Sequence, residues 1–330
     1  MSSALKFGLL LPHFGEHASV ANCLDGARRA EALGIDSVWV RDHLVFTPHP
    51  GEGSSDNSHI ESLLLLAAVA AATRKIQLGT AMTICHRHAI HLAQSVAGLS
   101  AISDGRVILG LGLGGFPHEF AAAGRPSTLT ERAKLAEINI DICRKLWAGE
   151  TLTHKSEYFA FENVALKPTP VKPVPLFIGG STPAACRRAV AAGDGWMPAR
   201  INLPTFAKRV EYLRALCQQA QKPMVQTAVM PFTTVGKNRD DALRGIDVKN
   251  LIDDAYNFSM WVKPPSGKFE TLEDIRGVIL AGSPADIVRE CRAYQQAGAD
   301  HIVFDLRLRF TDWFEQIDLL GTEVLPALCG

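Results

Sequence analysis

The stretch SDGRVILGLGLGGFPHE, residues 103–119, is the most informative segment of this 330-residue chain. Its apolar run from Val107 to Leu113 is interrupted only by glycines, a pattern typical of strands buried on both faces in parallel sheets. Glycines at the carboxyl end of such a strand let a ligand approach the backbone closely. The stretch therefore predicts a parallel α/β fold with a ligand at the carboxyl end of a strand.

Two alternatives explain the same glycines. Gly110, Gly112 and Gly115 match the G-x-G-x-x-G fingerprint of dinucleotide-binding folds, which belongs in the first strand-to-helix turn of a βαβ unit. Here the pattern begins inside the strand, Phe116-Pro117 follows it, and at least three strand-like segments precede it. A nicotinamide site is therefore a minor alternative. A glycine-containing core strand without any ligand is the other.

The composition excludes several classes of protein. The chain has 34 basic and 34 acidic side chains, so zero net charge gives no electrostatic argument for binding nucleic acid or an anionic membrane. The start of the chain lacks the features of a signal peptide, and the longest apolar run, residues 63–72, is too short to span a bilayer. The seven cysteines show no C-x-x-C spacing. We expect a cytoplasmic protein with reduced cysteines, no metal site, and neither nucleic acid nor membrane as a partner.

Strand-like and helix-like segments alternate eight times along the chain. The expected strands are 6–12, 35–40, 76–84, 107–113, 175–179, 195–199, 225–235 and 301–306, and the expected helices are 18–33, 63–73, 92–102, 131–147, 183–192, 204–219, 284–297 and 313–328. This alternation predicts a TIM-like (β/α)8 barrel, with an open doubly wound sheet as the alternative. Segments 151–175 and 239–268 break the pattern, and we expect them to be excursions from a single barrel domain covering residues 1–330.

Residues that follow the strands are the candidates for chemistry, because barrel active sites lie at the carboxyl ends of the strands. Asp42 and His43 come directly after the second strand, where a buried polar pair needs partners. Histidine can exchange a proton near neutral pH, so His43 is the candidate catalytic residue, with a structural histidine as the alternative. Further strand-end residues expected to face the same cavity are His13, Thr80, Ala81, Met82, Gly112, Leu113, Gly114, Gly115, Gly179, Gly180, Ser181, Trp196 and Arg200.

The sequence Gly179-Gly180-Ser181-Thr182 precedes a helix expected to begin at Pro183. Backbone N–H groups at a helix N-terminus, together with two hydroxyl groups, can bind an anion such as a cofactor phosphate. An ordinary turn with a Ser or Thr N-cap accounts for the same residues equally well.

Taken together, these pieces resemble the luciferase-like monooxygenase superfamily, and within it the branch that uses the deazaflavin coenzyme F-420. The matching segments are VWVRDH (38–43), LGTAM (78–82), GRVILGLG (105–112), EF (119–120), PLFIGGS (175–181) and GDGW (193–196). The resemblance implies a TIM-like barrel with an insertion, usually a homodimer, that holds a flavin or deazaflavin at the barrel mouth for hydride transfer. We expect the apolar helix 63–73 to pack in the dimer interface.

The resemblance also implies roles for individual residues. In the deazaflavin branch an Asp-His pair lies against the ring, and a non-prolyl cis peptide, here expected near Ala81-Met82, bulges behind it. The expected cofactor-binding residues are Asp42, Thr80, Ala81, Met82, Gly112, Leu113, Gly114, Gly179, Gly180 and Ser181, with His43 as the catalytic residue and no metal.

The chain departs from the family at two points. Gly115 or Phe116 stands where the sugar-phosphate dehydrogenases of the branch carry a catalytic glutamate, so that substrate class is not expected. Ala89 stands where the family often has proline, and the phosphate contacts of that loop are expected to differ. Segments 47–59, 117–130 and 239–268 are expected to shape the substrate site.

The resulting hypothesis is hydride transfer between reduced coenzyme F-420 and a small organic substrate. One alternative is a two-component monooxygenase that uses reduced FMN and dioxygen, and a second is a binding barrel without a cofactor. The Asp-His pair favours the deazaflavin, since many FMN-dependent members carry Glu-His-His there. A separate flavin or F-420 reductase is the expected supplier of reduced cofactor.

Overall fold

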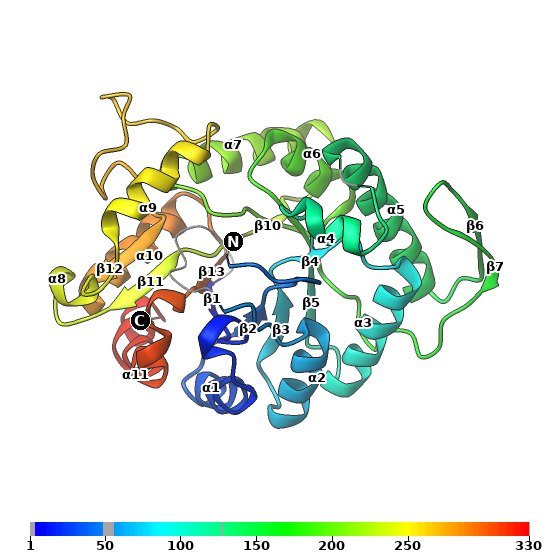
Figure 1. The fold of residues 1–330 in the computed structure, drawn as a ribbon, viewed down its shortest axis with the longest axis horizontal. Helices are drawn as coiled ribbons and strands as arrows, with labels where there is room; N and C mark the ends of the chain where they lie inside the picture. Colours follow the sequence, from blue (N-terminus) through cyan, green and yellow to red (C-terminus); the bar gives the residue numbers. More distant parts are fainter. Residues whose placement is uncertain (1–3, 49–55, 127, 330) are drawn as a thin grey trace.

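Eight parallel strands close into a barrel in the part of the chain that the structure, a computed structural model, describes: residues 4–48, 56–126 and 128–329 (Figure 1). In barrel order they are β1 (Lys6–Leu10), β2 (Ser37–Val40), β3 (Gln77–Thr80), β5 (Val107–Gly112), β8 (Leu176–Gly179), β9 (Gly195–Met197), β10 (Gln226–Val229) and β13 (His301–Phe304), and β13 pairs with β1. The predicted TIM-like barrel is confirmed, and the open sheet is excluded.

Side chains inside the barrel explain why the strands contain glycine. All six residues of β5 are buried, and the interior next to β3 is filled by the fully buried indole of Trp39. A Cβ atom at Gly79 would lie 2.4 Å from that indole. Because the interior is close-packed, a side chain at position 79 would displace the tryptophan.

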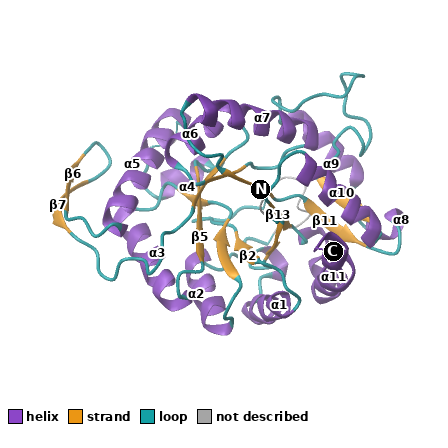
Figure 2. Ribbon diagram, turned by 180° about the vertical axis from the view of Figure 1, so that it is seen from behind, coloured by secondary structure: helices purple, strands orange, loops and turns teal. Residues whose placement is uncertain are grey.

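A ring of helices surrounds the barrel (Figures 1 and 2). They are α1 (Val20–Ala32), α2 (Ser62–Ala72), α3 (Ala89–Ser103), α5 (Leu129–Trp147), α6 (Pro183–Ala192), α7 (Leu203–Gln219), α10 (Pro284–Gln296), α11 (Trp313–Leu319) and α12 (Leu325–Cys329). The short helix α4 (Pro117–Ala122) lies inside this ring (Figures 1 and 2). Across the described residues, no helix combines the length and hydrophobicity needed to cross a membrane.

Helix α2 owes much of its apolar character to packing within the chain. It contacts α1 on one side and α3 on the other, and Leu63, Leu65 and Leu66 are buried. Leu64, in contrast, is 72% exposed on the outer surface.

The strand expected at 76–84 is divided in two. After β3, the peptide bond between Ala81 and Met82 is cis, as the resemblance predicts, and the chain resumes as β4 (Thr83–Ile84), which pairs with β5. Segment 117–130, expected as a loop, contains α4, whose first residue, Pro117, suits the first turn of a helix. Residues 49–55 of the expected loop 47–59 lie outside the described residues.

The prediction of a single strand at 225–235 is wrong. The barrel strand β10 ends at Val229, and β11 (Phe232–Val235) leaves the barrel to pair with β12 (Ile279–Gly282), which the sequence did not indicate. Pro231 lies between the two strands and has no N–H group for a sheet ladder. After β10 the chain therefore leaves the barrel wall, and Phe232 at the start of β11 lines the cavity at the barrel mouth.

The two expected excursions differ in structure. Segment 151–175 contains the antiparallel hairpin of β6 (Leu152–Lys155) and β7 (Ala160–Val164), which projects away from the barrel (Figure 1). Segment 239–268 contains α8 (Arg239–Ala242) and α9 (Val248–Asp254). It packs on β11 and β12 around a separate small core that includes Leu251, Trp261 and Phe269.

Candidate active site

A cavity of about 1120 Å³ lies at the carboxyl ends of the barrel strands. Ligand pockets typically measure about 300–1,000 Å³, so this cavity has room for a large cofactor together with a substrate. The predicted site residues that line it are Asp42, His43, Ala81, Met82, Gly112, Leu113, Gly114, Gly179 and Gly180, joined by the candidates Gly115 and Arg200.

Four of the expected strand-end residues do not line the cavity. Thr80 is buried and its hydroxyl lies 3.0 Å from the Gly110 carbonyl and 2.9 Å from the Gly110 N–H, which ties β3 to β5. Ser181 donates a long hydrogen bond of 3.5 Å to the Ala199 carbonyl. Trp196 is fully buried and donates to the Gly180 carbonyl at 2.8 Å.

His13 is the fourth of these residues, and its ring holds the backbone just after β2. Its ring is fully buried, its Nδ1 donates to the Ile60 carbonyl at 3.2 Å, and its Nε2 accepts from the Arg41 N–H at 2.9 Å. Burial, and then the neighbouring His59, hold the pKa of His13 well below its usual range. His13 is therefore a neutral structural histidine.

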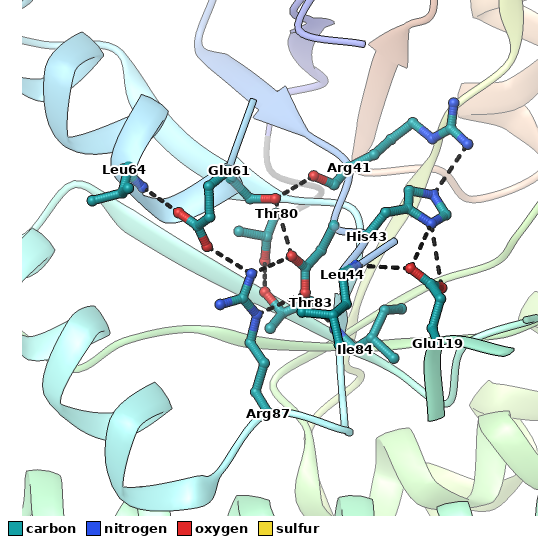
Figure 3. Close-up of polar contacts among 12 residues, drawn as sticks. Arg41, His43, Leu44, Glu61, Leu64, Thr80, Thr83, Ile84, Arg87 and Glu119 are labelled. Atoms are coloured by element: carbon teal, nitrogen blue, oxygen red, sulfur yellow. Dashed lines mark hydrogen bonds and ion pairs between the residues drawn. The ribbon is translucent and has the colours of Figure 1, made fainter. Parts of the chain in front are cut away.

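Asp42 is the centre of a closed buried network. Its carboxylate accepts hydrogen bonds from Arg87 at 2.5 and 2.9 Å, from the Ile84 N–H at 2.9 Å and from the Ser62 hydroxyl at 3.1 Å. Burial acts to raise the pKa of Asp42, but the hydrogen bonds and charge of Arg87 outweigh it and hold the pKa below its usual range. Arg87 also pairs with Glu61, the N-cap of α2, at 2.6 Å (Figure 3). The ionised Asp42 thus ties the end of β2 to α2 and β4.

His43 lies on the opposite side of the chain, between Glu119 and Arg41 (Figure 3). Its Nδ1 is 3.3 and 3.4 Å from the two carboxylate oxygens of Glu119, and its Nε2 is 3.2 Å from Nη2 of Arg41. Because a guanidinium group can only donate, Nε2 accepts, and Nδ1 carries the ring proton toward Glu119. This arrangement fixes the tautomer and the orientation of the imidazole.

Glu119 comes from α4 and is held in place by the loop that follows β2. One carboxylate oxygen accepts from the Leu44 N–H at 2.7 Å and from the Val45 N–H at 3.2 Å. Burial acts to raise the pKa of Glu119, but the His43 hydrogen bond and charge and these backbone donors outweigh it, and the pKa is lowered. The carboxylate is therefore ionised at neutral pH.

Sequence reasoning did not identify the pairing of Glu119 with His43. The two residues are 76 positions apart, and Glu119 lies beyond the strand end, in a segment expected to be a loop. The available indication was Phe116-Pro117, which can begin a helix and thereby place Glu119 in the first turn of that helix.

Two groups of charged residues line other parts of the cavity. Lys134 from α5 and Arg188 from α6 line the cavity, as do Gly180 and Thr182 before α6, and Nε of Arg188 lies 3.6 Å from the Glu137 carboxylate. The Thr182 hydroxyl accepts from the Ala185 N–H at 3.2 Å and serves as the N-cap. A helix N-terminus with a lysine on the wall of the same cavity can bind a phosphate group.

On the other side of the cavity each arginine has an acidic partner. Arg307 pairs with Asp305 at 2.6 and 2.9 Å, and Arg200 pairs with Asp254. Both guanidinium groups also lie over the ring of Phe232, at 5.3 and 4.8 Å. This wall therefore combines aromatic surface with paired charges.

Comparison with known proteins identifies relatives of the whole chain. A family model described as luciferase-like monooxygenase matches residues 5–301. An F-420-dependent glucose-6-phosphate dehydrogenase from Amycolatopsis mediterranei is 30% identical over 307 residues, which cover 84% of this chain and 86% of the relative.

Solved structures with the same fold include an F-420-dependent and an FMN-bound enzyme. An F-420-dependent secondary alcohol dehydrogenase, in complex with an F-420–acetone adduct, superposes with a TM-score of 0.81 at 22% identity and covers 99% of both chains. The FMN-bound oxygenating constituent of 3,6-diketocamphane monooxygenase from Pseudomonas putida superposes with a TM-score of 0.77 at 20% identity and covers 98% of both chains. At these identities the likeness shows the fold alone.

Proposed function

The chain belongs to the luciferase-like monooxygenase family, and from this premise we propose that it is an oxidoreductase that transfers a hydride between coenzyme F-420 and a small organic substrate. The observation that carries the proposal is the pairing of His43 with Glu119 at the wall of a 1120 Å³ cavity, in a chain related over its length to F-420-dependent dehydrogenases.

The residues of the cavity fit a planar cofactor with a phosphorylated tail. A Cβ atom at Gly179 would lie 2.7 Å from the Met82 side chain and 3.4 Å from Gly112, so glycine there makes room for Met82, which follows the cis peptide bond and lines the cavity. Gly180 and Thr182 precede α6, and Lys134, which lines the same cavity, would provide positive charge for the tail. When bound, coenzyme F-420 supplies or accepts the hydride at a carbon of its central ring.

His43 is proposed to exchange the proton that accompanies hydride transfer. Glu119 holds the Nδ1 proton, so Nε2 is the nitrogen for proton exchange: a substrate hydroxyl that replaces the hydrogen bond from Arg41 would give its proton to Nε2, and Nε2 would return it to a carbonyl oxygen. The ionised carboxylate also stabilises the positive charge that develops on the ring during this exchange. Asp42, Ala81, Met82, Gly112, Leu113, Gly114, Gly179 and Gly180 are proposed to surround the cofactor, with Thr80 and Ser181 supporting that wall from behind.

The substrate, partners and location are proposed as follows. Gly115 or Phe116 stands at the position where the sugar-phosphate dehydrogenases of the branch are expected to carry a catalytic glutamate, so we propose a different small organic substrate. The exposed Leu64 on the apolar helix α2 supports a homodimer through this face. We also propose a cytoplasmic enzyme whose reduced cofactor comes from a separate reductase.

A two-component monooxygenase using reduced FMN and dioxygen is the second candidate, because the same cavity accepts a flavin ring and an FMN-bound protein shares the fold. Lys134 and the Arg188–Glu137 pair give this part of the cavity wall a net positive charge, which favours coenzyme F-420, whose tail carries more negative charge than the single phosphate of FMN.

Titration of the protein with coenzyme F-420 and with FMN, followed by cofactor fluorescence, tests the proposal. We expect saturable binding of coenzyme F-420 with a dissociation constant at least about tenfold lower than that of FMN. Tighter binding of FMN would support the monooxygenase. Saturable binding of neither compound would support a barrel that works without a cofactor.

A further inference from the structure

We propose that Arg41 is a substrate-binding catalytic residue, whose guanidinium group binds the reacting oxygen of the substrate together with Nε2 of His43. The inference deepens the proposed function and rests on it. Arg41 precedes the Asp-His pair at the end of β2 and lines the cavity beside His43.

The guanidinium group of Arg41 lies within hydrogen-bond distance of His43. Its Nη2 lies 3.2 Å from Nε2 of His43 (Figure 3). An oxygen atom placed at about 2.9 Å from both nitrogens completes a triangle of ordinary hydrogen-bond lengths. Because Nε2 has a single lone pair, a substrate hydroxyl that donates to Nε2 takes the place of the direct hydrogen bond between Arg41 and His43, and its oxygen accepts from Nη2 instead.

The guanidinium group is also held in a fixed orientation. It lies 4.4 Å above the ring of Phe14 and 5.4 Å from the ring of Phe46, and Arg41 is only 5% exposed. The backbone N–H of Arg41 is anchored on the buried His13. A donor that is fixed before the substrate binds needs little reorganisation during the reaction.

The charge of Arg41 suits the reaction. In alcohol oxidation the carbinol C–H bond breaks and its electron pair leaves with the hydride to the cofactor, the hydroxyl proton moves to Nε2 of His43, and a C=O double bond forms. Ketone reduction is the reverse. In both directions negative charge develops on the substrate oxygen, and a guanidinium group, which stays protonated, stabilises that charge without taking part in the proton transfer.

The other cavity-lining arginines are placed differently. Arg200 and Arg307 lie over the ring of Phe232, Arg307 also lies 5.3 Å from the ring of Phe14, and Arg188 comes from α6. Arg200 therefore provides a matched control, since it is a guanidinium group on an aromatic ring in the same cavity.

Acetate is the probe for the test, because it is planar, has the size of a small ketone and carries an anionic oxygen. Acetate is titrated calorimetrically into protein loaded with coenzyme F-420, with chloride added to match ionic strength. We expect Arg41→Met to weaken acetate binding at least about tenfold and Arg200→Met to change it less than about threefold. Arg41→Lys keeps the charge but loses the planar fork, and we expect an intermediate loss.

Three outcomes would overturn the assignment: equal acetate binding by wild type and Arg41→Met, no acetate binding by wild type, or a loss confined to Arg200→Met. Circular dichroism and thermal melting establish that each variant is folded, and Arg41→Lys decides the matter if Arg41→Met does not fold. The same titrations without cofactor separate the two proposals. If coenzyme F-420 does not bind, the proposed function fails, while the order of acetate affinities still tests Arg41.

Discussion

Two polar networks begin at neighbouring residues, Asp42 and His43, and they serve different purposes. Successive side chains leaving a strand point in opposite directions, so Asp42 turns toward α2 and β4 while His43 turns toward α4. The Asp42 carboxylate is surrounded by protein donors, and its network is closed. The ring of His43 is held by Glu119 on one side and lies at the cavity wall on the other. Adjacent polar residues at one strand end can thus divide into an anchor and a reacting group.

The largest effect is expected at the reacting group. His43→Ala removes the proposed proton acceptor, and we expect kcat to fall by about 10²–10⁴ while the dissociation constant of coenzyme F-420 stays nearly unchanged. Steady-state F-420 reduction with a substrate found by screening measures the first quantity, and fluorescence titration measures the second. A variant with near-normal turnover would rule out this role for His43.

At the anchor the expected effect is on stability. Asp42→Ala leaves the charge of Arg87 without its buried partner, and removing one member of a buried pair costs about 3–5 kcal/mol. Urea denaturation measures the change in the free energy of unfolding. The control is Glu61→Ala, which removes the more exposed partner of the same arginine together with the N-cap of α2, and it should cost about 1–2 kcal/mol. Equal losses in the two variants would contradict the distinction between them.

The pH dependence of the anchor has a definite sign. The pKa of Asp42 is lower in the folded protein than its ordinary value of 3.8, so its stabilising contribution is present above about pH 4 and is lost as the pH falls through the folded-state pKa. The difference in unfolding free energy between wild type and Asp42→Ala should therefore shrink in acid. A difference that grows on acidification would contradict the assignment of Asp42 as an ionised anchor.

The barrel and the strand-end positions could be predicted from the sequence because they depend on local pattern. Eight strand–helix units give the closed sheet, and the rule for barrel mouths located Asp42, His43 and the glycine clusters. The same rule did not separate Thr80 and His13, which point away from the cavity, from residues that line it. A four-residue strand buried on both sides contains no pattern that tells one face from the other.

Features that depend on contacts between distant segments could not be predicted. Strand β12 is four residues long and forms by pairing with β11, which has left the barrel. Pro231 indicates a break between β10 and β11 but does not indicate the new partner of β11. The partnership of Glu119 with His43 requires knowing that α4 turns back over the end of β2. Both are consequences of tertiary packing rather than of local propensity.

A smaller effect is expected at Glu119, which holds the ring of His43. Glu119→Gln keeps an oxygen that can accept from Leu44 and Val45 but removes the negative charge beside His43. We expect kcat to fall about 10–100-fold, the range seen when a group that orients a functional histidine is changed, with KM and the melting temperature little altered. Parallel kinetics and thermal melting measure these quantities. A large drop in melting temperature with unchanged kcat would instead place Glu119 with Asp42 among the anchors.

The smallest predicted effect concerns Gly180, which lines the cavity before α6. The experiment decides whether Gly180 is only a turn residue or part of the binding surface. Its φ is +122°, and a Cβ atom there would lie 3.0 Å from that of Ala185. A valine would therefore strain the backbone and also extend into the space in front of α6. We expect Gly180→Val to raise the dissociation constant of coenzyme F-420 at least about tenfold, or about 1.4 kcal/mol.

Backbone strain and steric exclusion can be separated with a second glycine. Gly149 also has a positive φ, +83°, but a Cβ atom there meets nothing within 4 Å, and the residue does not line the cavity. Gly149→Val should therefore show the cost of a branched side chain at positive φ with no effect on cofactor affinity. If Gly180→Val lowered the melting temperature as much as Gly149→Val but bound coenzyme F-420 normally, Gly180 would be a turn residue only. Loss of affinity at Gly180 with a melting temperature no lower than that of Gly149→Val would indicate that the cofactor approaches the backbone there, because strain common to both glycines does not produce it and displacement of Ala185 would lower the melting temperature further.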